Sequence, residues 1–176
     1  AALGKKVETH RDSFVYSVAP WDLTVALDLR RQQVKQLVEP GQINLKHSHG
    51  GIVTLEYAIQ YLQVMHGHRH PSLRTPNTLR ALAALIDVGL IPRATGENLR
   101  KSYLFIRMLI DGLRMVRGNT KDLVIPPPDS DEFIFLARRV GYQTEDWQAG
   151  ARHLQTDIEE HMKQNRQFFE KMFGKV

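Results

Sequence analysis

The sequence contains no cysteine, and this absence removes several kinds of chemistry at once. Disulfide bonds, zinc sites built on thiolates and cysteine nucleophiles are all excluded. No apolar run approaches the length of about 20 residues that a membrane-spanning helix needs. No signal-peptide pattern opens the sequence either. We therefore expect a cytoplasmic protein that does not enter a membrane.

A strong excess of charge of one sign is also missing. The 176 residues carry a formal net charge of +5 without a block of like charges, which counts against nucleic acid as a partner. Apolar residues make up 42% and charged residues 24%, and these proportions are typical of a globular protein. A chain of this length is long enough to bury a sizeable core in one domain.

Common signatures of nucleotide binding and hydrolysis are absent. The sequence has no Gly-x-x-x-x-Gly-Lys-Ser/Thr loop, no Gly-x-Ser-x-Gly elbow and no His-Glu-x-x-His helix. Its only Asp-x-Asp, at 129–131, follows three prolines and opens a helix, where Asp and Ser are expected as caps. Five of the eight histidines fall between His47 and His70, but their spacing does not indicate a ligand set. We predict no catalytic residue and no metal site in this chain.

The pattern of apolar residues predicts an all-α fold. Apolar side chains recur at spacings of three and four over six segments between residue 20 and residue 176, and short turns with Gly or Pro separate these segments. We expect an antiparallel bundle of about six helices over 20–176. Residues 1–19 show no sustained period and include the β-like run 14–18, so a short extended arm is expected there.

The stretch from Lys46 to Gln63 is the most informative part of the sequence. Gly50 and Gly51 lead directly into a helix, and glycine permits a positive φ or a close approach of two backbones. The apolar face of this helix consists of Ile52, Leu55, Ile59, Leu62 and Met65, and its polar face of Glu56, Gln60 and Gln63. The free amides of the first turn are expected to point outward, where an anion would be stabilised. The stretch is either a working surface or a plain turn with a solvated helix face.

A second candidate surface is a basic stripe on the long helix expected at 96–117. Arg100, Arg107 and Arg114 are seven residues apart and are joined by Arg117, while Asp111 neutralises part of the stripe. The stripe could bind phosphates, an RNA backbone or an acidic protein, or it could be a solvated helix face. Aromatic residues do not interleave with it, which argues against single-strand binding by base stacking.

Several longer stretches follow one another in an order that is more specific than any single one. They are Pro-Gly-Gln-Ile-Asn-Leu-Lys at 40–46, Gly-Gly-Ile-Val-Thr-Leu-Glu-Tyr at 50–57, Arg-Thr-Pro-Asn-Thr-Leu at 74–79, Leu-Arg-Met-Val-Arg-Gly at 113–118 and Phe-Leu-Ala-Arg-Arg at 135–139. With them, residues 21–176 resemble the helical domain that follows the nucleotidyltransferase domain in glutamine synthetase adenylyltransferases. The PII uridylyltransferases belong to the same wider group.

The usual family form of the central motif is Gly-Gly-Ile-Arg-Asp-Ile-Glu-Phe, and this chain departs from it twice. Val53 stands where Arg is common and Thr54 where Asp is common. Glu56 is therefore the only carboxylate of the motif in this chain. Any role of the motif that needs two carboxylates is in doubt here.

The resemblance implies an enzyme that transfers AMP from ATP to a tyrosine of glutamine synthetase, and that removes it again in bifunctional members. It also implies the PII signal protein as a regulator. Mg²⁺ and ATP would be held by the preceding nucleotidyltransferase domain, of which residues 1–19 would be a remnant, and this chain would hold no cofactor.

The resemblance leads us to expect a non-catalytic module that packs beside the active site of that domain. The residues that would face the active site are Lys46, Gly50, Gly51, Glu56 and Gln60. One alternative is a stand-alone module that binds protein or RNA through the basic stripe. Another is a small metal-dependent hydrolase that uses the histidines between 47 and 70.

Overall fold

The computed structural model describes residues 2–16, 22–118 and 122–174. These residues form seven α-helices, one short 3-10 helix and no β-strand, which confirms the predicted all-α bundle. The elements are α1 (Ala2–Val15), α2 (Leu23–Leu37), α3 (Ile52–His66), η1 (Pro71–Leu73), α4 (Thr78–Asp87), α5 (Arg93–Arg117), α6 (Asp131–Arg139) and α7 (Trp147–Phe173). None of the described helices combines the length and the apolar character needed to cross a bilayer.

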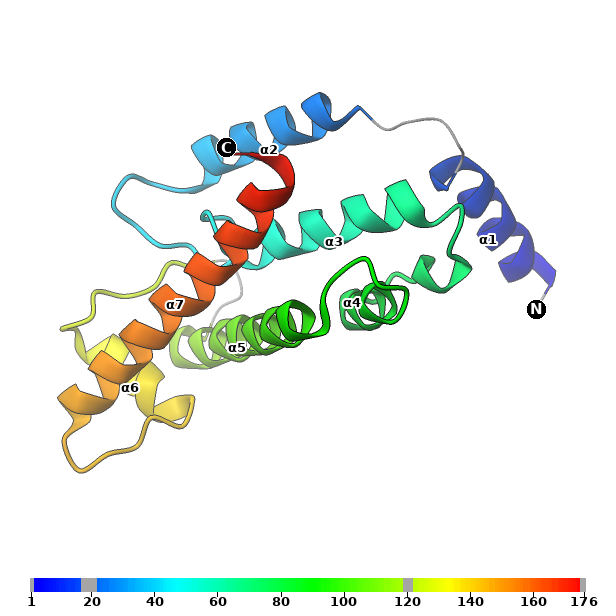
Figure 1. Ribbon diagram of the computed structural model, residues 1–176. Coiled ribbons are helices and arrows are strands. Elements are labelled where there is room, and N and C mark those ends of the chain that lie inside the picture. Colours follow the sequence, from blue (N-terminus) through cyan, green and yellow to red (C-terminus); the bar gives the residue numbers. More distant parts are fainter. Residues whose placement is uncertain (1, 17–21, 119–121, 175–176) are drawn as a thin grey trace.

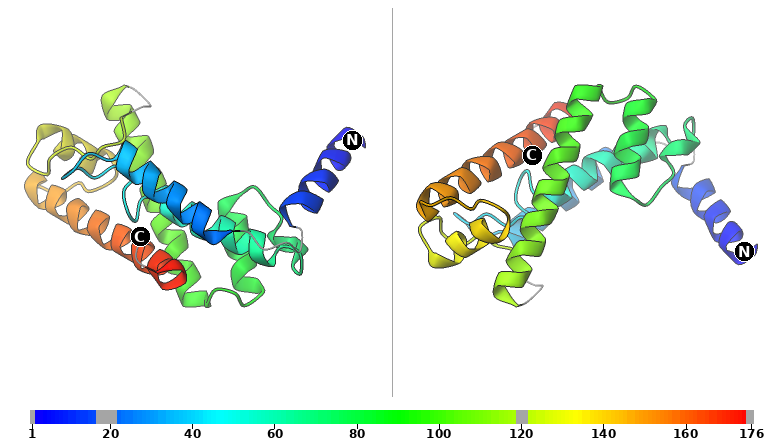
Figure 2. Two further views of the ribbon diagram at one scale, coloured as in Figure 1. Left: turned by 90° about the horizontal axis from the view of Figure 1, so that it is seen from above. Right: turned by 90° about the horizontal axis from the view of Figure 1, so that it is seen from below.

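The helices are arranged around α3 and α5, with α7 crossing both obliquely (Figures 1 and 2). α4 packs against α3 and α5 at one end of the molecule, and α6 packs against α5 and α7 at the other. α2 runs beside α3 and the C-terminal end of α7, while α1 projects from the end of the molecule that is far from α6. The start of α3 therefore lies where α2 and α7 come together.

The predicted extended N-terminal segment is wrong, because residues 2–15 form α1. This segment contains one glycine and no proline, and Ala2, Leu3, Lys5, Lys6, Glu8 and Arg11 are strong helix formers. Phe14 and Val15, which suggested a strand, continue the helix to its end. The expected boundary between 1–19 and 20–176 lies outside the described residues.

The end of α1 contacts the end of α3 through Tyr16. The Arg74 guanidinium lies 5.4 Å from the centre of the Tyr16 ring, and Arg74 also pairs with Asp12 at 3.6 Å. A Cβ atom at Gly67 would overlap the same ring. A glycine directly after a helix suggests a left-handed cap, but Gly67 has a right-handed backbone with a φ of −64°, so this prediction is wrong. Glycine is needed there because the tyrosine ring approaches closely.

Side-chain caps fix where several helices begin. The side chains of Asp22, Asn77, Ser130 and Asp146 each accept a hydrogen bond from an amide in the first turn of the helix that follows. From their residue types Thr75 and Thr144 are expected as caps of α4 and α7, but the caps Asn77 and Asp146 lie two residues later. In the 129–131 segment Ser130 caps α6, in agreement with the predicted capping role of this segment.

Buried apolar residues form two clusters. The first lies among α5, α6 and α7 and includes Ile106, Leu109, Leu113, Phe133, Leu136, Leu154 and Ile158. The second lies among α3, α4 and α5 and includes Leu73, Leu82, Leu85, Ile91 and Leu99. α3 gives Ile52 and Val53 to the first cluster and Leu55 and Ile59 to the second. Because Tyr103 packs against both, α3 and α5 together join the two parts of the core.

α2 is held differently from the other helices. The helical spacing of Leu23, Leu27, Val34, Leu37 and Val38 predicts a buried stripe, but Leu37 is 49% exposed and the other four are only partly buried. The one buried side chain of α2 is Arg30. The predicted apolar stripe is therefore only partly buried, and a polar contact through Arg30 adds to it.

Desolvation lowers the pKa of four histidines, of which all but the exposed His49 are partly buried. They are His47, His49, His66 and His161. The His161 ring packs against Phe105 with 4.4 Å between ring centres, and its Nδ1 atom is buried without a hydrogen-bond partner. Since an imidazolium ion in this position would lose hydration, the folded protein favours the neutral ring.

We expect the free energy of unfolding to decrease as the pH falls below 6.5, the ordinary pKa of histidine. The folded-state pKa of His161 lies below this value, so the unfolded chain takes up the proton first and protonation favours unfolding. The decrease should end once the pH is below the folded-state pKa. Chemical denaturation at a series of pH values measures it. His161→Phe should flatten the decrease, whereas the exposed control His153→Phe should not, and equal slopes in both variants would contradict the assignment.

Candidate functional site at the start of helix α3

The turn before α3 is organised by the side chain of Asn44. Its Oδ1 atom accepts hydrogen bonds from the amides of Lys46 and His47, both at 3.0 Å. The Ser48 hydroxyl oxygen accepts from the Asn44 amide at 2.8 Å. Asn44 also forms an isolated antiparallel bridge with Val124, so the turn is tied to the segment that precedes α6. The turn thus has a fixed conformation that depends on its own polar side chains.

The two glycines are needed for backbone contacts inside the protein. Gly50 has a φ of +87°, and a Cβ atom there would overlap the carbonyl oxygen of Met162 in α7. A Cβ atom at Gly51 would lie 2.7 Å from the carbonyl oxygen of Leu45. The fully buried Asn165 of α7 donates from Nδ2 to the carbonyl oxygen of Gly50 at 3.0 Å. Together these contacts join the start of α3 to α7.

The first-turn amides of α3 were expected to point outward and stabilise an anion, and this expectation is wrong. The amides of Ile52 and Val53 donate to the carbonyl oxygens of Leu45 and Lys46, at 2.9 and 3.2 Å. The preceding turn folds back over the helix start and supplies these acceptors. The helix N-terminus is therefore already satisfied by the chain itself.

Arg30 of α2 reaches into the same turn. Its Nη2 atom donates to the carbonyl oxygen of His47 at 2.8 Å and to the Thr54 hydroxyl at 2.9 Å, and the carbonyl oxygen of Ser48 lies at 3.3 Å. The Thr54 hydroxyl also accepts from the amide of Gly50 at 3.1 Å. Arg30 is 1% exposed, and desolvation lowers its pKa. A guanidinium ion and a hydroxyl thus connect α2, the turn and α3.

The five residues expected to share one face lie in different surroundings. Lys46 is exposed on the turn, whereas Gly50 and Gly51 are buried. Glu56 is half-buried and accepts a hydrogen bond from the Tyr103 hydroxyl of α5 at 3.3 Å. Gln60 is exposed beside a hollow of about 270 Å³ among α2, α3 and α7. Only Lys46 and Gln60 are thus exposed for contact with another domain.

The basic stripe of α5 is divided by ion pairs. Arg117 pairs with Asp122 at 3.0 Å and with Glu132 at 2.5 Å. Arg114 pairs with Asp111 at 3.4 Å. Arg100 and Arg107 are exposed, and neither forms an ion pair with a described residue. The four arginines therefore do not act as one continuous cationic surface.

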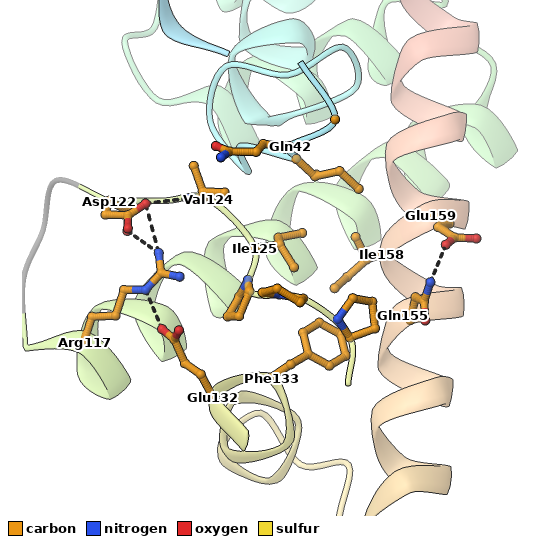
Figure 3. Close-up of a pocket in the computed structure, with 15 residues that line it drawn as sticks. Gln42, Arg117, Asp122, Val124, Ile125, Glu132, Phe133, Gln155, Ile158 and Glu159 are labelled. Carbon is orange, nitrogen blue, oxygen red and sulfur yellow. Dashed lines mark hydrogen bonds and ion pairs between the residues drawn. The ribbon is translucent and has the colours of Figure 1, made fainter. Parts of the chain in front are cut away.

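A wide hollow of about 590 Å³ lies between the proline segment, α6 and α7 (Figure 3). Figure 3 shows Arg117 between Asp122 and Glu132 on one side, and Gln155 donating to Glu159 on the other. Apolar side chains, among them Ile125, Phe133 and Ile158, line the space between them. The charged and amide side chains on the two sides of the hollow are thus already paired with one another.

Among the described residues, no three His, Asp or Glu side chains are grouped as a metal site would require. Asp129 and Asp131 are exposed on either side of the cap of α6. The important residues that sequence reasoning missed are Arg30 and Asn165. Neither belongs to a recognisable spacing, and Arg30 is followed directly by the exposed Arg31. Only their contacts with distant parts of the chain show that Arg30 and Asn165 are important.

Gly50→Ala should destabilise the fold by roughly 2 kcal/mol more than Gly89→Ala does. Both glycines have a positive φ, so both substitutions strain the backbone, but nothing lies within 4 Å of a Cβ atom at Gly89. The difference between the two variants isolates the contact with Met162. Urea denaturation of both variants measures it, and equal losses of stability would show that this contact is unimportant.

Thr54→Val should lower the free energy of unfolding by about 1–3 kcal/mol, because it leaves a buried guanidinium and a buried amide with one acceptor fewer. Thr24→Val is the matched control, since Thr24 is exposed in α2 and its hydroxyl makes no hydrogen bond with a described residue. Thermal unfolding of the two variants and the unsubstituted chain compares them. A Thr54→Val variant as stable as the control would contradict the role assigned to this hydroxyl.

Comparison with known proteins identifies relatives over most of the chain. Residues 25–173 match the family model for GlnD PII-uridylyltransferase. The bifunctional glutamine synthetase adenylyltransferase/adenylyl-removing enzyme of Corynebacterium efficiens is 32% identical over 168 residues, which are 94% of this chain and 15% of the relative.

The enzyme of the same name from Mycobacterium tuberculosis (strain H37Rv) is 37% identical over 120 residues, which are 66% of this chain and 12% of the relative. This chain thus spans 15% or less of the length of these two relatives. The chain therefore belongs to the GlnD PII-uridylyltransferase family, as a helical domain of the kind found in glutamine synthetase adenylyltransferases.

Proposed function

We propose that this chain is a non-catalytic helical domain of an enzyme that adenylylates glutamine synthetase, and that it packs beside the active site of a nucleotidyltransferase domain. The observation that carries the proposal is the coverage: 94% of the chain aligns with only 15% of a relative named for this activity. In this proposal the nucleotidyltransferase domain binds ATP and Mg²⁺. Glutamine synthetase is the substrate, the PII protein is a regulator, and the enzyme works in the cytoplasm.

The contacts at the start of α3 support a scaffolding role. Gly50, Gly51 and Thr54 are used in contacts that hold helices together, and Glu56 is bonded to Tyr103. A carboxylate that accepts a hydrogen bond from within the core is well placed to fix the orientation of α3 against α5. The motif would thus maintain the shape of a surface rather than carry out a reaction.

The exposed residues of the motif would form the contact with the neighbouring domain. Lys46 lies on a turn that Asn44 and Arg30 hold in place, so its position is fixed although its side chain is free. Gln60 is exposed on α3, the helix that follows this turn. A rigid turn that presents one cation is suited to an acidic or phosphate-bearing surface, because little ordering is needed when it binds.

The alternative was a stand-alone module that binds protein or RNA through the basic stripe. The ion pairs of Arg114 and Arg117 weaken this alternative, because they leave only Arg100 and Arg107 without a carboxylate partner. Two exposed arginines two turns apart provide a smaller electrostatic attraction than the four that the sequence suggested.

The chain alone should transfer no AMP to glutamine synthetase when it is incubated with radiolabelled ATP and Mg²⁺. The same assay on a longer protein that joins this domain to its nucleotidyltransferase domain should show transfer. There, Lys46→Glu should reduce the rate by roughly tenfold if one charged contact at the domain interface is reversed. The control is Lys35→Glu, which reverses an exposed charge at the end of α2. Transfer by the chain alone, or equal rates in both variants, would overturn the proposal.

A further inference from the structure

Arg30 is a buried cation without a carboxylate partner. It is 1% exposed, yet none of the described carboxylates forms an ion pair with it. Its guanidinium group donates to the carbonyl oxygens of His47 and Ser48 and to the Thr54 hydroxyl. It also donates to the Gln33 side-chain oxygen at 3.1 Å. All these acceptors are neutral. Burying an unpaired charge is costly, so the site has a strong electrostatic preference for an anion.

Two more basic side chains surround the same place. His49 from the turn and Arg166 from α7 line a small hollow together with Arg30, Gly50 and Thr54. Desolvation and the positive charges of Arg30 and Arg166 lower the pKa of His49, so its imidazole favours the neutral form. Arg30 from α2 and Arg166 from α7 thus bring two guanidinium groups to one space, beside the imidazole of His49.

Glu170 is the acidic residue beside this hollow. It lines the space with Phe169, and its charge acts in the opposite direction on the pKa of His49. Its carboxylate, however, forms no ion pair with Arg30, His49 or Arg166. The positive groups around the space therefore exceed the negative ones, and the direct acceptors of Arg30 carry no charge.

The size of the hollow limits what can enter it. Its volume is about 10 Å³, which is close to the space that a single water molecule needs. One oxygen atom of a larger group fits, while the rest of that group would remain outside. An ionised oxygen accepts stronger hydrogen bonds from a guanidinium than water does.

We propose that the hollow between Arg30, His49 and Arg166 is an oxyanion-binding site that takes one oxygen atom of a carboxylate or phosphate group. The bound oxygen supplies the negative charge that Arg30 lacks, and Arg166 binds the part of the group that stays outside. Because Arg30 holds α2 to the turn, an anion bound here also strengthens the attachment of α2. This inference concerns binding by the chain itself and does not depend on the proposed enzymatic role.

The test is a titration of the isotope-labelled 176-residue chain with sodium acetate and, separately, with sodium phosphate. The amide resonances of Gly50 and Gly51 and the Nε–Hε resonance of Arg30 report on the site in two-dimensional NMR spectra. We expect these resonances to shift and to saturate with at least one of the two anions. Tighter binding of acetate would assign the site to carboxylates, and tighter binding of phosphate would assign it to phosphate groups.

Arg166→Gln should weaken the binding by roughly tenfold, since it removes one charged contact from an exposed position. Lys163→Gln is the matched control, because it removes an equal charge from the same helix without lining the hollow. A general effect of ionic strength would change both variants alike. Equal affinities in these two variants, or shifts that never saturate, would overturn the proposal.

Thr54→Asp provides an independent test. The Thr54 hydroxyl lies 2.9 Å from Nη2 of Arg30, so a carboxylate at this position would pair with Arg30 from within the chain. The variant should lose anion binding and should unfold at a temperature no lower than that of the unsubstituted chain. Undiminished anion binding by folded Thr54→Asp would show that the anion does not contact Arg30 and would overturn the site. If this variant does not fold, the comparison of Arg166→Gln with Lys163→Gln decides.

Discussion

The contact between Gly50 and the backbone of α7 is the one on which the rest of the structure depends. It places the start of α3 against Met162 and Asn165, and this position determines which residues of α3 point into which part of the core. The first turn of α3 packs in the cluster among α5, α6 and α7, and later residues of α3 pack in the cluster with α4. A side chain at position 50 would push the two helices apart, and both clusters would lose contacts.

Arg30 adds a second, polar connection to the same place. No apolar side chain of α2 is fully buried, and the guanidinium group of Arg30 bonds this helix to the turn and to α3. The two departures from the usual family motif are both used here. Val53 is 7% exposed and joins the core, while Thr54 accepts a hydrogen bond from Arg30. Where other members have an acid at position 54, this chain offers a neutral hydroxyl.

The sequence predicted the helices well where local signals are strong. The apolar period of α3, the capping role of 129–131 and the end of α5 at Arg117 all follow from residues close in sequence. The N-terminal helix was missed because Phe14 and Val15 resembled a strand, although the polar residues before them favour a helix.

The site was harder to predict than the helices. Gly50 and Gly51 were recognised as important, but their function could not be inferred, because the groups that require glycine include an α7 carbonyl more than a hundred positions away in sequence. The role of Arg30 was hidden for the same reason, since a charged residue on a polar helix is expected to face water. Contacts between distant segments decide both cases, and a single sequence does not reveal them.

The hydrogen bond between Asn165 and Gly50 joins residues separated by 115 positions. Closing so large a loop costs conformational entropy before the contact contributes any stabilisation, and folds dominated by such contacts form slowly. During synthesis, α3 emerges long before the helix that completes its surroundings. Its glycine turn therefore stays without its partner until α7 has left the ribosome.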